Sequence, residues 1–324
     1  MESYKLSIII PAYNGEQYID SCLAWLDKQS LKEIQVVFID DGSTDDTLRK
    51  LNANSKPNML VLSQKNAGAG AARNYGIANA KGEYIAFLDV DDRFAADNAL
   101  ELLYSKAKEN DADICGGTLI STVDGNSKKV RAFDVEGLIE FEDCQCDFGF
   151  TRFIYRKEFL NKYKIMFPGY RVYEDPVFLL RAMVRAERFY AITESVYAYS
   201  GSHQNALNTK KTIDYLKGLK DNLLLSAKYE YSVLHLSLFE QLKGIASFYA
   251  ELNLEDGDPE LFTALLRANA AIDKRLLKNE GIEISEDYLI PALNTVWKAS
   301  SNYMRLRKKF AIVDFLKGIV RRRR

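Results

Sequence analysis

The sequence has few cysteines and histidines, and this scarcity excludes two kinds of site. Four cysteines in 324 residues lack the density and spacing of a secreted disulfide framework, so we expect reduced thiols and a cytoplasmic protein. A structural zinc ion needs four Cys or His ligands close together. Only Cys144 and Cys146 are near neighbours, and no histidine lies near them, so we do not expect zinc.

Long apolar runs are also missing. No stretch reaches the roughly 18 to 20 uninterrupted apolar residues of a membrane-spanning helix. Residues 1–11 contain no charged leader or small-residue cleavage site, so we expect no signal peptide. With 47% apolar and 27% charged residues, the composition predicts a globular protein, long enough for one large α/β domain and a further region.

Charge is balanced over the whole chain but not along it. The formal net charge is -1, yet nine basic residues and one aspartate lie from Tyr303 onward, which gives +8 there and -9 elsewhere. Apolar residues from Phe310 to Val320 add an amphipathic pattern, which predicts peripheral attachment to an anionic surface on the inner face of the cell membrane. The alternative is an ordinary helix packed on the domain, with a solvated basic tail. We expect no nucleic-acid partner.

The first ninety residues alternate strand-like and helix-like segments. This alternation predicts an α/β fold with a mainly parallel sheet and helices on both faces, whose ligands bind beyond the carboxyl ends of the strands. We expect helices over residues 17–29, after Ser43 and from about Ala69. The expected strands are residues 6–10, 35–39, 59–62 and 84–89.

After Asp92 the alternation loosens. Residues 112–122 and 150–156 are strand-like, and residues 156–163 predict a short helix. From about Thr209 the sequence is mostly helical, with very few glycines or prolines. We therefore predict boundaries near residues 95 and 205, with a helical region over 206–324.

Polar motifs follow the first two strands. After the first, an aromatic ring at Tyr13 can lie against a nucleotide base, although an ordinary turn with a packing tyrosine is the alternative. Asp40 and Asp41 close the second strand, where carboxylates can accept hydrogen bonds from a pyrimidine imide or from ribose hydroxyls. The alternative is that Asp41 and Ser43 cap the next helix.

Small residues fill the segment from Asn66 to Asn74, which enters a helix. They permit close approach of the backbone, and the amino terminus of a helix attracts anions. Arg73, one turn inside, can pair with a phosphate or orient a neighbouring carboxylate. Tight packing of a helix on a sheet would use the same small residues.

Three carboxylates, Asp89, Asp91 and Asp92, crowd the end of the fourth strand. Their repulsion destabilises the fold unless a cation offsets it. Mg²⁺ and Mn²⁺ prefer oxygen ligands and typically bind one or two carboxylates and substrate phosphates. The motif therefore predicts a divalent metal site, with a solvated acidic loop as the alternative.

A later acidic pair, Glu174 and Asp175, precedes Pro176. The pair suits the first turn of a helix, and it would equally suit a general base. His203 lies in a polar loop, where a lone histidine is at least as often structural as catalytic.

Taken in order, these motifs resemble the family 2 glycosyltransferases over about residues 5–205. The resemblance implies a GT-A nucleotide-diphospho-sugar transferase fold, in which residues 1–95 bind the nucleotide sugar and residues 96–205 bind the acceptor. It also implies inversion at the anomeric carbon. Transfer of a single sugar is expected because the Gln-x-x-Arg-Trp motif of processive synthases is absent. The matching motifs are Pro-Ala-Tyr-Asn, Asp-Asp-Gly-Ser-Thr-Asp, Ala-Arg-Asn-Tyr-Gly, Phe-Leu-Asp-Val-Asp-Asp and Tyr-Glu-Asp.

The resemblance also assigns roles. Asp91 matches the direct ligand of Mn²⁺ or Mg²⁺, with Asp89 and Asp92 beside it, and Asp175 matches the catalytic base, with Glu174 adjacent. The donor would be a UDP-sugar, and the acceptor a saccharide or a lipid-linked saccharide of cell-surface polysaccharide synthesis. The candidates for binding the nucleotide sugar are Pro11, Ala12, Tyr13, Asn14, Asp40, Asp41, Asn66, Arg73, Asp89 and His203.

Two other functions are alternatives to a metal-dependent glycosyltransferase. A sugar-nucleotidyltransferase would want a Gly-rich, lysine-bearing loop after the first strand, and Asn14-Gly15-Glu16 is not one. A non-catalytic sugar-binding protein on the same fold would have lost a metal ligand or the base, and none is lost here.

Overall fold

The computed structural model describes residues 4–123, 127–146, 148–201, 207–253 and 258–295. Internal contacts divide the chain into two compact units, Met1–Ala206 and Leu207–Arg324, and each is described by itself. The candidate His203 and the basic segment from Tyr303 lie outside the described residues.

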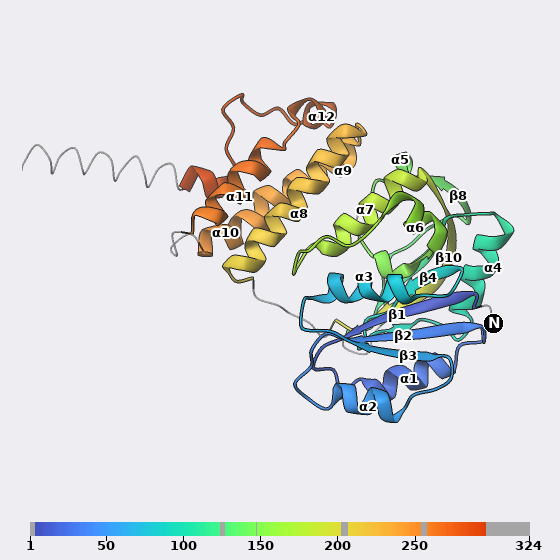
Figure 1. Ribbon diagram of the computed structural model, residues 1–324. Helices are drawn as coiled ribbons and strands as arrows, with labels where there is room; N and C mark the ends of the chain where they lie inside the picture. Colours follow the sequence, from blue (N-terminus) through green and yellow to red (C-terminus); the bar gives the residue numbers. More distant parts are fainter. Residues whose placement is uncertain (1–3, 124–126, 147, 202–206, 254–257, 296–324) are drawn as a thin grey trace, which may run out of the picture. The chain divides into compact units, whose positions relative to one another are not determined.

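The first unit contains one ten-stranded sheet (Figure 1). Its strands are β1 Leu6–Ala12, β2 Ile34–Asp40, β3 Met59–Ser63, β4 Tyr84–Phe87, β5 Arg93–Phe94, β6 Ile114–Ser121, β7 Lys128–Arg131, β8 Gly137–Glu140, β9 Phe153–Arg156 and β10 Arg188–Tyr199. The order is β3-β2-β1-β4-β9-β6-β10-β5, with β7 on β6 and β8 on β10. Strands β1 to β4 pair in parallel, whereas β9 is antiparallel to both neighbours. The predicted α/β fold is confirmed, with a mixed sheet beyond β4.

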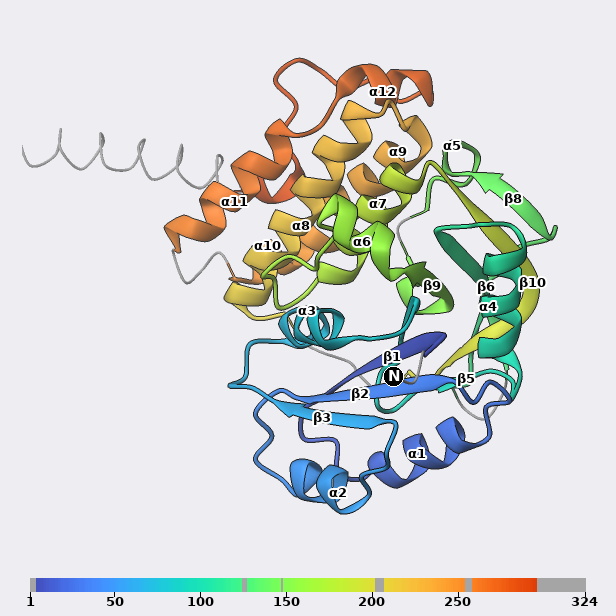
Figure 2. The same ribbon diagram turned by 45° about the vertical axis from the view of Figure 1, so that its right-hand side comes forward.

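Helices cover both faces of the sheet. They are α1 Ile19–Asp27, α2 Thr47–Ala53, α3 Ala69–Asn79, α4 Ala99–Glu109, α5 Phe141–Cys144, the 3-10 helix η2 Phe150–Arg152, α6 Lys157–Tyr163 and α7 Glu174–Ala186. Figure 2 shows α1 and α2 on one side of β1, β2 and β3, and α3 on the other. This arrangement explains why β1 and β2 are almost continuously apolar, since parallel strands covered on both faces leave no solvent-facing side.

Alternate residues of β1 divide between the two faces. Ile8 and Ile10 belong to the cluster that includes Leu23 of α1. Ile9 faces α3, where a Cβ added at Gly76 would lie 2.5 Å from Ile9 Cγ2. The same added atom would lie 2.9 Å from Cδ1 of Ile39 on β2. Gly76 therefore permits α3 to lie close to the sheet, and it lies just beyond the Asn66–Asn74 segment that the sequence analysis considered.

Two predicted strands differ in detail. The fourth ends at Phe87 rather than Asp89, so the acidic motif lies in the loop that follows it. The segment 150–156 begins as η2, because Gly149 has a left-handed backbone and its carbonyl oxygen accepts from the backbone N–H of Arg152 at 3.2 Å. Only Phe153–Arg156 is a strand.

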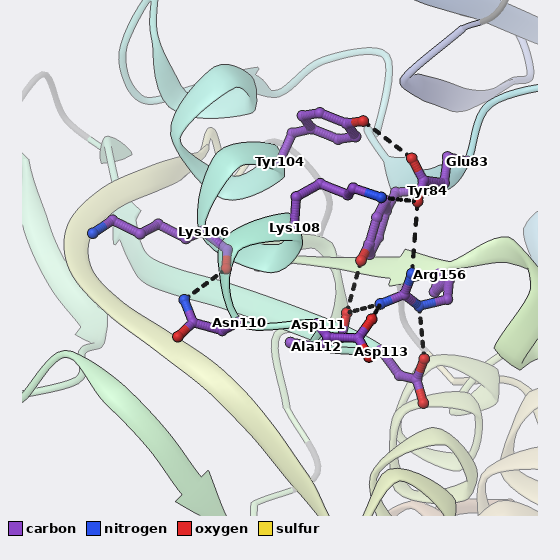
Figure 3. Close-up of polar contacts among 10 residues, drawn as sticks. All are labelled: Glu83, Tyr84, Tyr104, Lys106, Lys108, Asn110, Asp111, Ala112, Asp113 and Arg156. Carbon is purple, nitrogen blue, oxygen red and sulfur yellow. Dashed lines mark hydrogen bonds and ion pairs between the residues drawn. The ribbon is translucent and has the colours of Figure 1, made fainter.

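An ion-pair cluster joins β9 to its neighbours (Figure 3). Arg156 Nη2 lies 2.7 Å from Asp111 Oδ1, Nε lies 2.8 Å from Asp113 Oδ1, and Nη1 lies 3.6 Å from Glu83 Oε1. Its guanidinium also lies 5.1 Å from the centre of the Tyr84 ring. These contacts are at the amino-terminal end of β4, the end away from the acidic motif, so they hold the sheet together without entering the candidate site.

The second unit is helical, as predicted. Its helices are α8 Thr209–Lys228, α9 Ser232–Gln241, the π-helical turn η3 Leu242–Ala246, α10 Ser247–Asn253, α11 Pro259–Ala270 and α12 Lys274–Asn279. His235 is fully buried in this unit, with Nδ1 2.8 Å from Ser226 Oγ and Nε2 accepting the backbone N–H of Asp273 at 2.8 Å. This histidine is therefore structural. None of the helices in the described part of the chain has the length and apolar character needed to cross a membrane.

Candidate functional site

The loops after β1 and β2 are joined by hydrogen bonds. The backbone N–H of Asn14 donates to Ser43 Oγ at 3.0 Å, and Thr44 N–H donates to Asn14 Oδ1 at 2.8 Å. Asn14 has a left-handed backbone with φ 49°, which asparagine tolerates better than most residues. Pro11 and Ala12 close β1, and the next side chain, Tyr13, is 52% exposed. The tyrosine ring is thus available to a planar ligand at the carboxyl edge of the sheet.

Asp40 closes β2 and is 2% exposed. Its carboxylate accepts from the backbone N–H of Ser43 at 3.2 Å and from Ser63 Oγ at 3.1 Å. The residue that precedes α2 is Asp46, so the structure does not support a capping role for Asp41. Asp40 therefore ties the ends of β2 and β3 together beside Tyr13.

Asp41 fixes the loop that leads into α3. Its carboxylate accepts three hydrogen bonds of 2.8 Å, from Gln64 Nε2 and from the backbone N–H groups of Ala67 and Gly68. The residue is 3% exposed. A carboxylate offers about four acceptor positions, so this loop uses most of its capacity.

Arg73 lies at the centre of the candidate site. It is 3% exposed and binds three carboxylates that come from two distant segments. Nη2 lies 2.8 Å from Asp89 Oδ1, while Nη1 lies 2.6 Å from Asp175 Oδ1 and 3.3 Å from Glu174 Oε1. One guanidinium therefore connects the acidic motif after β4 with the acidic pair that begins α7.

Aromatic rings enclose this guanidinium. Its Cζ atom lies 4.7 Å from the ring centre of Phe150 and 5.3 Å from that of Phe167, and Phe167 stacks on Phe178 at 4.0 Å. Such surroundings exclude water and strengthen the attraction between the arginine and its carboxylates. These rings and the three carboxylates therefore hold the guanidinium of Arg73 in place.

The small residues before Arg73 admit the segment that carries the acidic pair. A Cβ added at Gly70 would lie 3.1 Å from Glu174 Cγ, and one added at Gly68 would lie 3.1 Å from Arg171 Cδ. Arg171 Nη1 donates to Asn66 Oδ1 at 2.6 Å. The candidate Asn66 therefore joins two loops, and Arg171 becomes an additional basic residue near the amino terminus of α3.

The carboxylates after β4 have separate environments. Asp92 is 5% exposed and accepts from Tyr197 Oη and from the backbone N–H of Ser200, both at 2.7 Å. Ser200 Oγ donates to Asp91 Oδ2 at 3.3 Å, and Asp89 pairs with Arg73. Burial, with the negative charge of Asp89, raises the pKa of Asp92 to about 7. The three side chains therefore do not gather into one cluster.

A divalent cation would have to bind part of this motif. Within the described ranges, no group of three or more His, Cys, Asp or Glu side chains is arranged to hold a metal ion. Asp89 and Asp91 are only partly buried and offer the hard oxygen ligands that Mg²⁺ and Mn²⁺ prefer. One or two carboxylates suffice when substrate phosphates supply further ligands, so the residues fit such an ion bound together with a substrate.

A cleft of about 440 Å³ opens beside Arg73. It is lined by Asp89, Asp92, Leu119, Val130, Arg131, Phe148, Gly149, Phe150, Thr151, Tyr173, Asp175, Pro176 and Tyr199. Asp175 reaches this cleft, whereas Glu174 is not among the lining residues. Burial raises the pKa of Asp175 well above its ordinary value, and the charges of Glu174 and Asp89 add to this against the attraction of Arg73. Perturbed carboxyl groups of this kind are common at functional sites.

Several residues of the site carry no signal in the sequence. Tyr197 donates to Asp92 across 105 positions, and its hydroxyl also accepts the backbone N–H of Asp89 at 3.2 Å. In the sequence, nothing distinguishes Phe150 and Phe167 from ordinary core residues. Arg171 could have been noticed, since it lies four positions before Asp175 in a glycine- and proline-containing loop.

The fold and the site together define the class of protein. The structure resembles residues 1–349 of TarS from S. aureus, in complex with UDP-GlcNAc, with a TM-score of 0.70 and 23% identity over 84% of this chain and 82% of that chain. This likeness confirms the GT-A glycosyltransferase fold. The sequence model described as Glycosyl transferase family 2 matches residues 7–178, and the chain belongs to that family.

Sequence relatives agree with this assignment. Poly(ribitol-phosphate) beta-glucosyltransferase of Bacillus spizizenii is 32% identical over 203 residues, which are 60% of this chain and 32% of that protein. Glycosyltransferase GlyG of Streptococcus pneumoniae is 27% identical over 236 residues, 67% of this chain and 77% of that protein. The chain thus spans about a third of the first relative and about three quarters of the second. The chain therefore contains a family 2 glycosyltransferase domain, as predicted, and this family match favours a glycosyltransferase over a sugar-nucleotidyltransferase.

Proposed function

We propose that the protein transfers a single sugar from a nucleotide-diphospho-sugar to a hydroxyl group of a saccharide or lipid-linked saccharide. The observation that carries this proposal is the cleft lined by both Asp89 and Asp175, with Arg73 between the two carboxylates. A donor bound over the acidic motif and an acceptor bound beside α7 would meet at this cleft. Two of the similar proteins support a UDP-sugar and a cell-surface glycan, since one was solved with UDP-GlcNAc and another is named for poly(ribitol-phosphate).

The proposed nucleotide site lies at the edge formed by the carboxyl ends of β1 and β2. Tyr13 is exposed for contact with a base, and Asp40 lies next to it at the end of the paired strand. Asp91, with Asp89, is the proposed ligand set for Mn²⁺ or Mg²⁺. When bound, such an ion neutralises the diphosphate that leaves.

Asp175 is the proposed base for the acceptor hydroxyl. Its carboxylate takes the proton of the acceptor hydroxyl as that oxygen attacks the anomeric carbon and the bond to the diphosphate breaks. A base on the face opposite the leaving group gives inversion at this carbon. Asp175 is preferred to Glu174 because it reaches the cleft, while Glu174 packs against Gly70 and is 7% exposed.

A donor panel tests this function. The purified protein is incubated with Mn²⁺ and each common nucleotide sugar, with and without saccharide acceptors, and release of the nucleotide diphosphate is measured. We expect release from one donor, UDP-linked, that increases with the matching acceptor. Equal release from the wild type and from Asp175→Asn would contradict the assigned base. No release from any donor under all acceptor conditions would contradict the function itself.

Peripheral attachment to an anionic membrane surface, through the segment from Tyr303, is part of the same proposal. It rests on the charge and apolar pattern of the sequence alone, because this segment lies outside the described residues. Flotation with vesicles tests it. Anionic vesicles should bind the full chain more strongly than neutral ones, and removal of residues 303–324 should abolish the difference.

A further inference from the structure

Arg152, at the end of η2, is a buried cation in an unusual environment. It is 2% exposed, and its Cζ atom lies 4.2 Å from the ring centre of Phe133 and 4.8 Å from that of Phe153. Nη1 donates to the carbonyl oxygen of Gly117 at 3.3 Å, and Nε has no hydrogen-bond partner. Within the described part of the chain, no carboxylate forms an ion pair with this guanidinium.

The sulfur of Cys146 is the contact that can balance this charge. Arg152 Nη2 lies 3.8 Å from Cys146 Sγ, within the range of a hydrogen bond to sulfur. An arginine stays protonated even when buried, and a buried cation without a counter-charge destabilises a fold by several kcal/mol. A thiolate at Cys146 would supply the counter-charge.

Cys144 completes the arrangement. Gln145, between the two cysteines, has a left-handed backbone with φ 43°. The neighbouring thiol of Cys144, the charge of Arg152 and the backbone of Phe148 lower the pKa of Cys146 to about 6 against the opposing effect of burial, whereas the pKa of Cys144 is raised. This direction favours the thiolate at Cys146 rather than at Cys144.

The two other cysteines serve as internal controls. Cys22 and Cys115 are buried, whereas Cys144 and Cys146 are both partly exposed. Burial raises the pKa of Cys22 to about 12 and also raises that of Cys115. Reactivity of a cysteine requires both thiolate character and access, and among the four cysteines Cys146 combines them, since the pKa of Cys144 is raised.

We propose that Cys146 is a redox modification site: its thiolate, held beside Arg152, is oxidised by hydrogen peroxide and then forms a disulfide with Cys144. The Cys146 sulfur attacks one peroxide oxygen, the O–O bond breaks, and the departing hydroxide takes up a proton to become water. The sulfur of Cys144 then attacks the resulting sulfenic acid, an S–S bond forms, and the S–O bond breaks with release of a second water. Two thiols and one peroxide thus give one disulfide and two waters.

The disulfide would affect the cleft. Oxidation removes the thiolate, and Arg152 then loses its counter-charge among the described residues. Phe148, Gly149, Phe150 and Thr151, between the two, line the cleft that also contains Asp175. Their displacement slows transfer, and this step rests on the proposed function, whereas the thiol chemistry does not.

Mass spectrometry of the full-length protein tests the thiol chemistry without an activity assay. At about pH 6.5, iodoacetamide should alkylate Cys146 about tenfold faster than Cys144, Cys22 or Cys115. One equivalent of peroxide should lower the mass of the peptide with both cysteines by about 2 Da, and a dithiol should restore it. In Cys144→Ser, dimedone should trap the sulfenic acid at Cys146. Similar alkylation rates for all four cysteines, or no mass change with peroxide, would overturn the proposal.

Variants identify the counter-charge. Arg152→Met should slow alkylation of Cys146 about tenfold, and Arg152→Lys, which keeps the charge, should largely preserve it. Asp147, next to Cys146 in the sequence, lies outside the described residues, so Asp147→Asn is the matched control and should leave the rate within about twofold. Faster alkylation in Asp147→Asn would mean that this carboxylate neutralises Arg152 and would overturn the assignment. This result is informative even where Arg152→Met fails to fold.

The effect on transfer is measured separately. Oxidation of the wild type should lower the transfer rate about tenfold and reversibly, while Cys146→Ser should be insensitive to peroxide. Disulfide formation with unchanged transfer would refute the effect on the cleft but not the site. Absence of transfer by the reduced protein would refute the proposed function and leave the thiol result intact.

Discussion

The guanidinium of Arg73 lies 2.6 Å from the carboxylate of Asp175, although 102 positions separate the two residues in the sequence. The same group holds Asp89 at 2.8 Å. The residue proposed as the base and a residue proposed to face the metal are thus fixed relative to each other by one buried cation. Changes at Arg73 should therefore affect stability and chemistry together.

Arg73→Met should lower the free energy of unfolding by about 3 to 5 kcal/mol, because it leaves three crowded carboxylates without a cation. Denaturant titration at neutral pH measures this loss. Arg49→Met, which breaks an exposed pair with Asp46, is the matched control and should unfold like the wild type. Equal midpoints for the two variants would show that the Arg73 cluster contributes little to stability.

Asp175→Asn should lower kcat by about 10² to 10⁴ and leave donor binding nearly unchanged, because the amide keeps the shape of the side chain but cannot accept the proton. Transfer rates and donor titrations measure the two effects separately. Glu174→Gln should lower kcat less, since this side chain does not line the cleft. If Glu174→Gln instead abolishes transfer while Asp175→Asn retains it, the base is assigned to the wrong residue.

Removal of divalent metal should abolish turnover, and Mn²⁺ or Mg²⁺ should restore it, because a bound divalent ion would neutralise charge on the leaving diphosphate. Asp91→Ala should weaken donor binding more in the presence of Mn²⁺ than in its absence. Isothermal titration with the nucleotide diphosphate measures both conditions. Full activity in excess EDTA would refute metal dependence.

Tyr197→Phe should destabilise the first unit by about 1 to 3 kcal/mol, because it removes the hydroxyl that donates to Asp92 and accepts from Asp89. The pKa of Asp92, already raised to about 7, should rise further without this donor. Tyr190→Phe is a control on the same strand, since its hydroxyl donates to the exposed Glu136 and not to a residue of the candidate site. The two variants should therefore differ clearly in thermal midpoint.

His235 should make the helical unit sensitive to acid. Burial lowers the pKa of this histidine from 6.5 to about 4, despite the opposing charge of Asp273, so folding favours the neutral ring. Its contribution to stability is complete above about pH 6.5 and is lost as the pH falls toward 4. The protection factors for amide hydrogen exchange over residues 226–279 should fall in that window. In His235→Gln the fall should be smaller, and an identical pH profile would contradict the assignment.

The sequence predicted the parallel strands because each is an apolar run that ends in a turn motif. Strand β10 was not predicted, since Thr193, Glu194 and Ser195 interrupt its alternation, and its register against β6 shifts at this point. Helix α4 was missed although Leu100, Leu103 and Ala107 have helical spacing. That signal was available in the sequence.

The sequence predicted which carboxylates belong to the site, but not the separate role of each one. Asp40 and Asp41 are adjacent and read as one motif, but one ties β2 to β3 and the other fixes the loop before α3. The sequence pattern of the three carboxylates after β4 also predicted one site. In the structure, however, Asp92 is buried and accepts a hydrogen bond from Tyr197 of the distant strand β10. These contacts span 23 positions for Asp40, 27 for Asp41 and 105 for Asp92, and local patterns do not contain them.

A substitution at Gly76 should alter the rate of transfer, although this residue lies outside the candidate site. Because a methyl group there would overlap Ile9 and Ile39, any larger residue must displace α3 or these two side chains. Arg73 is one turn away on the same helix, so it would move with it, and displacements of about 1 Å can change rates about a hundredfold. Catalytic variants can therefore arise at a position that no substrate touches.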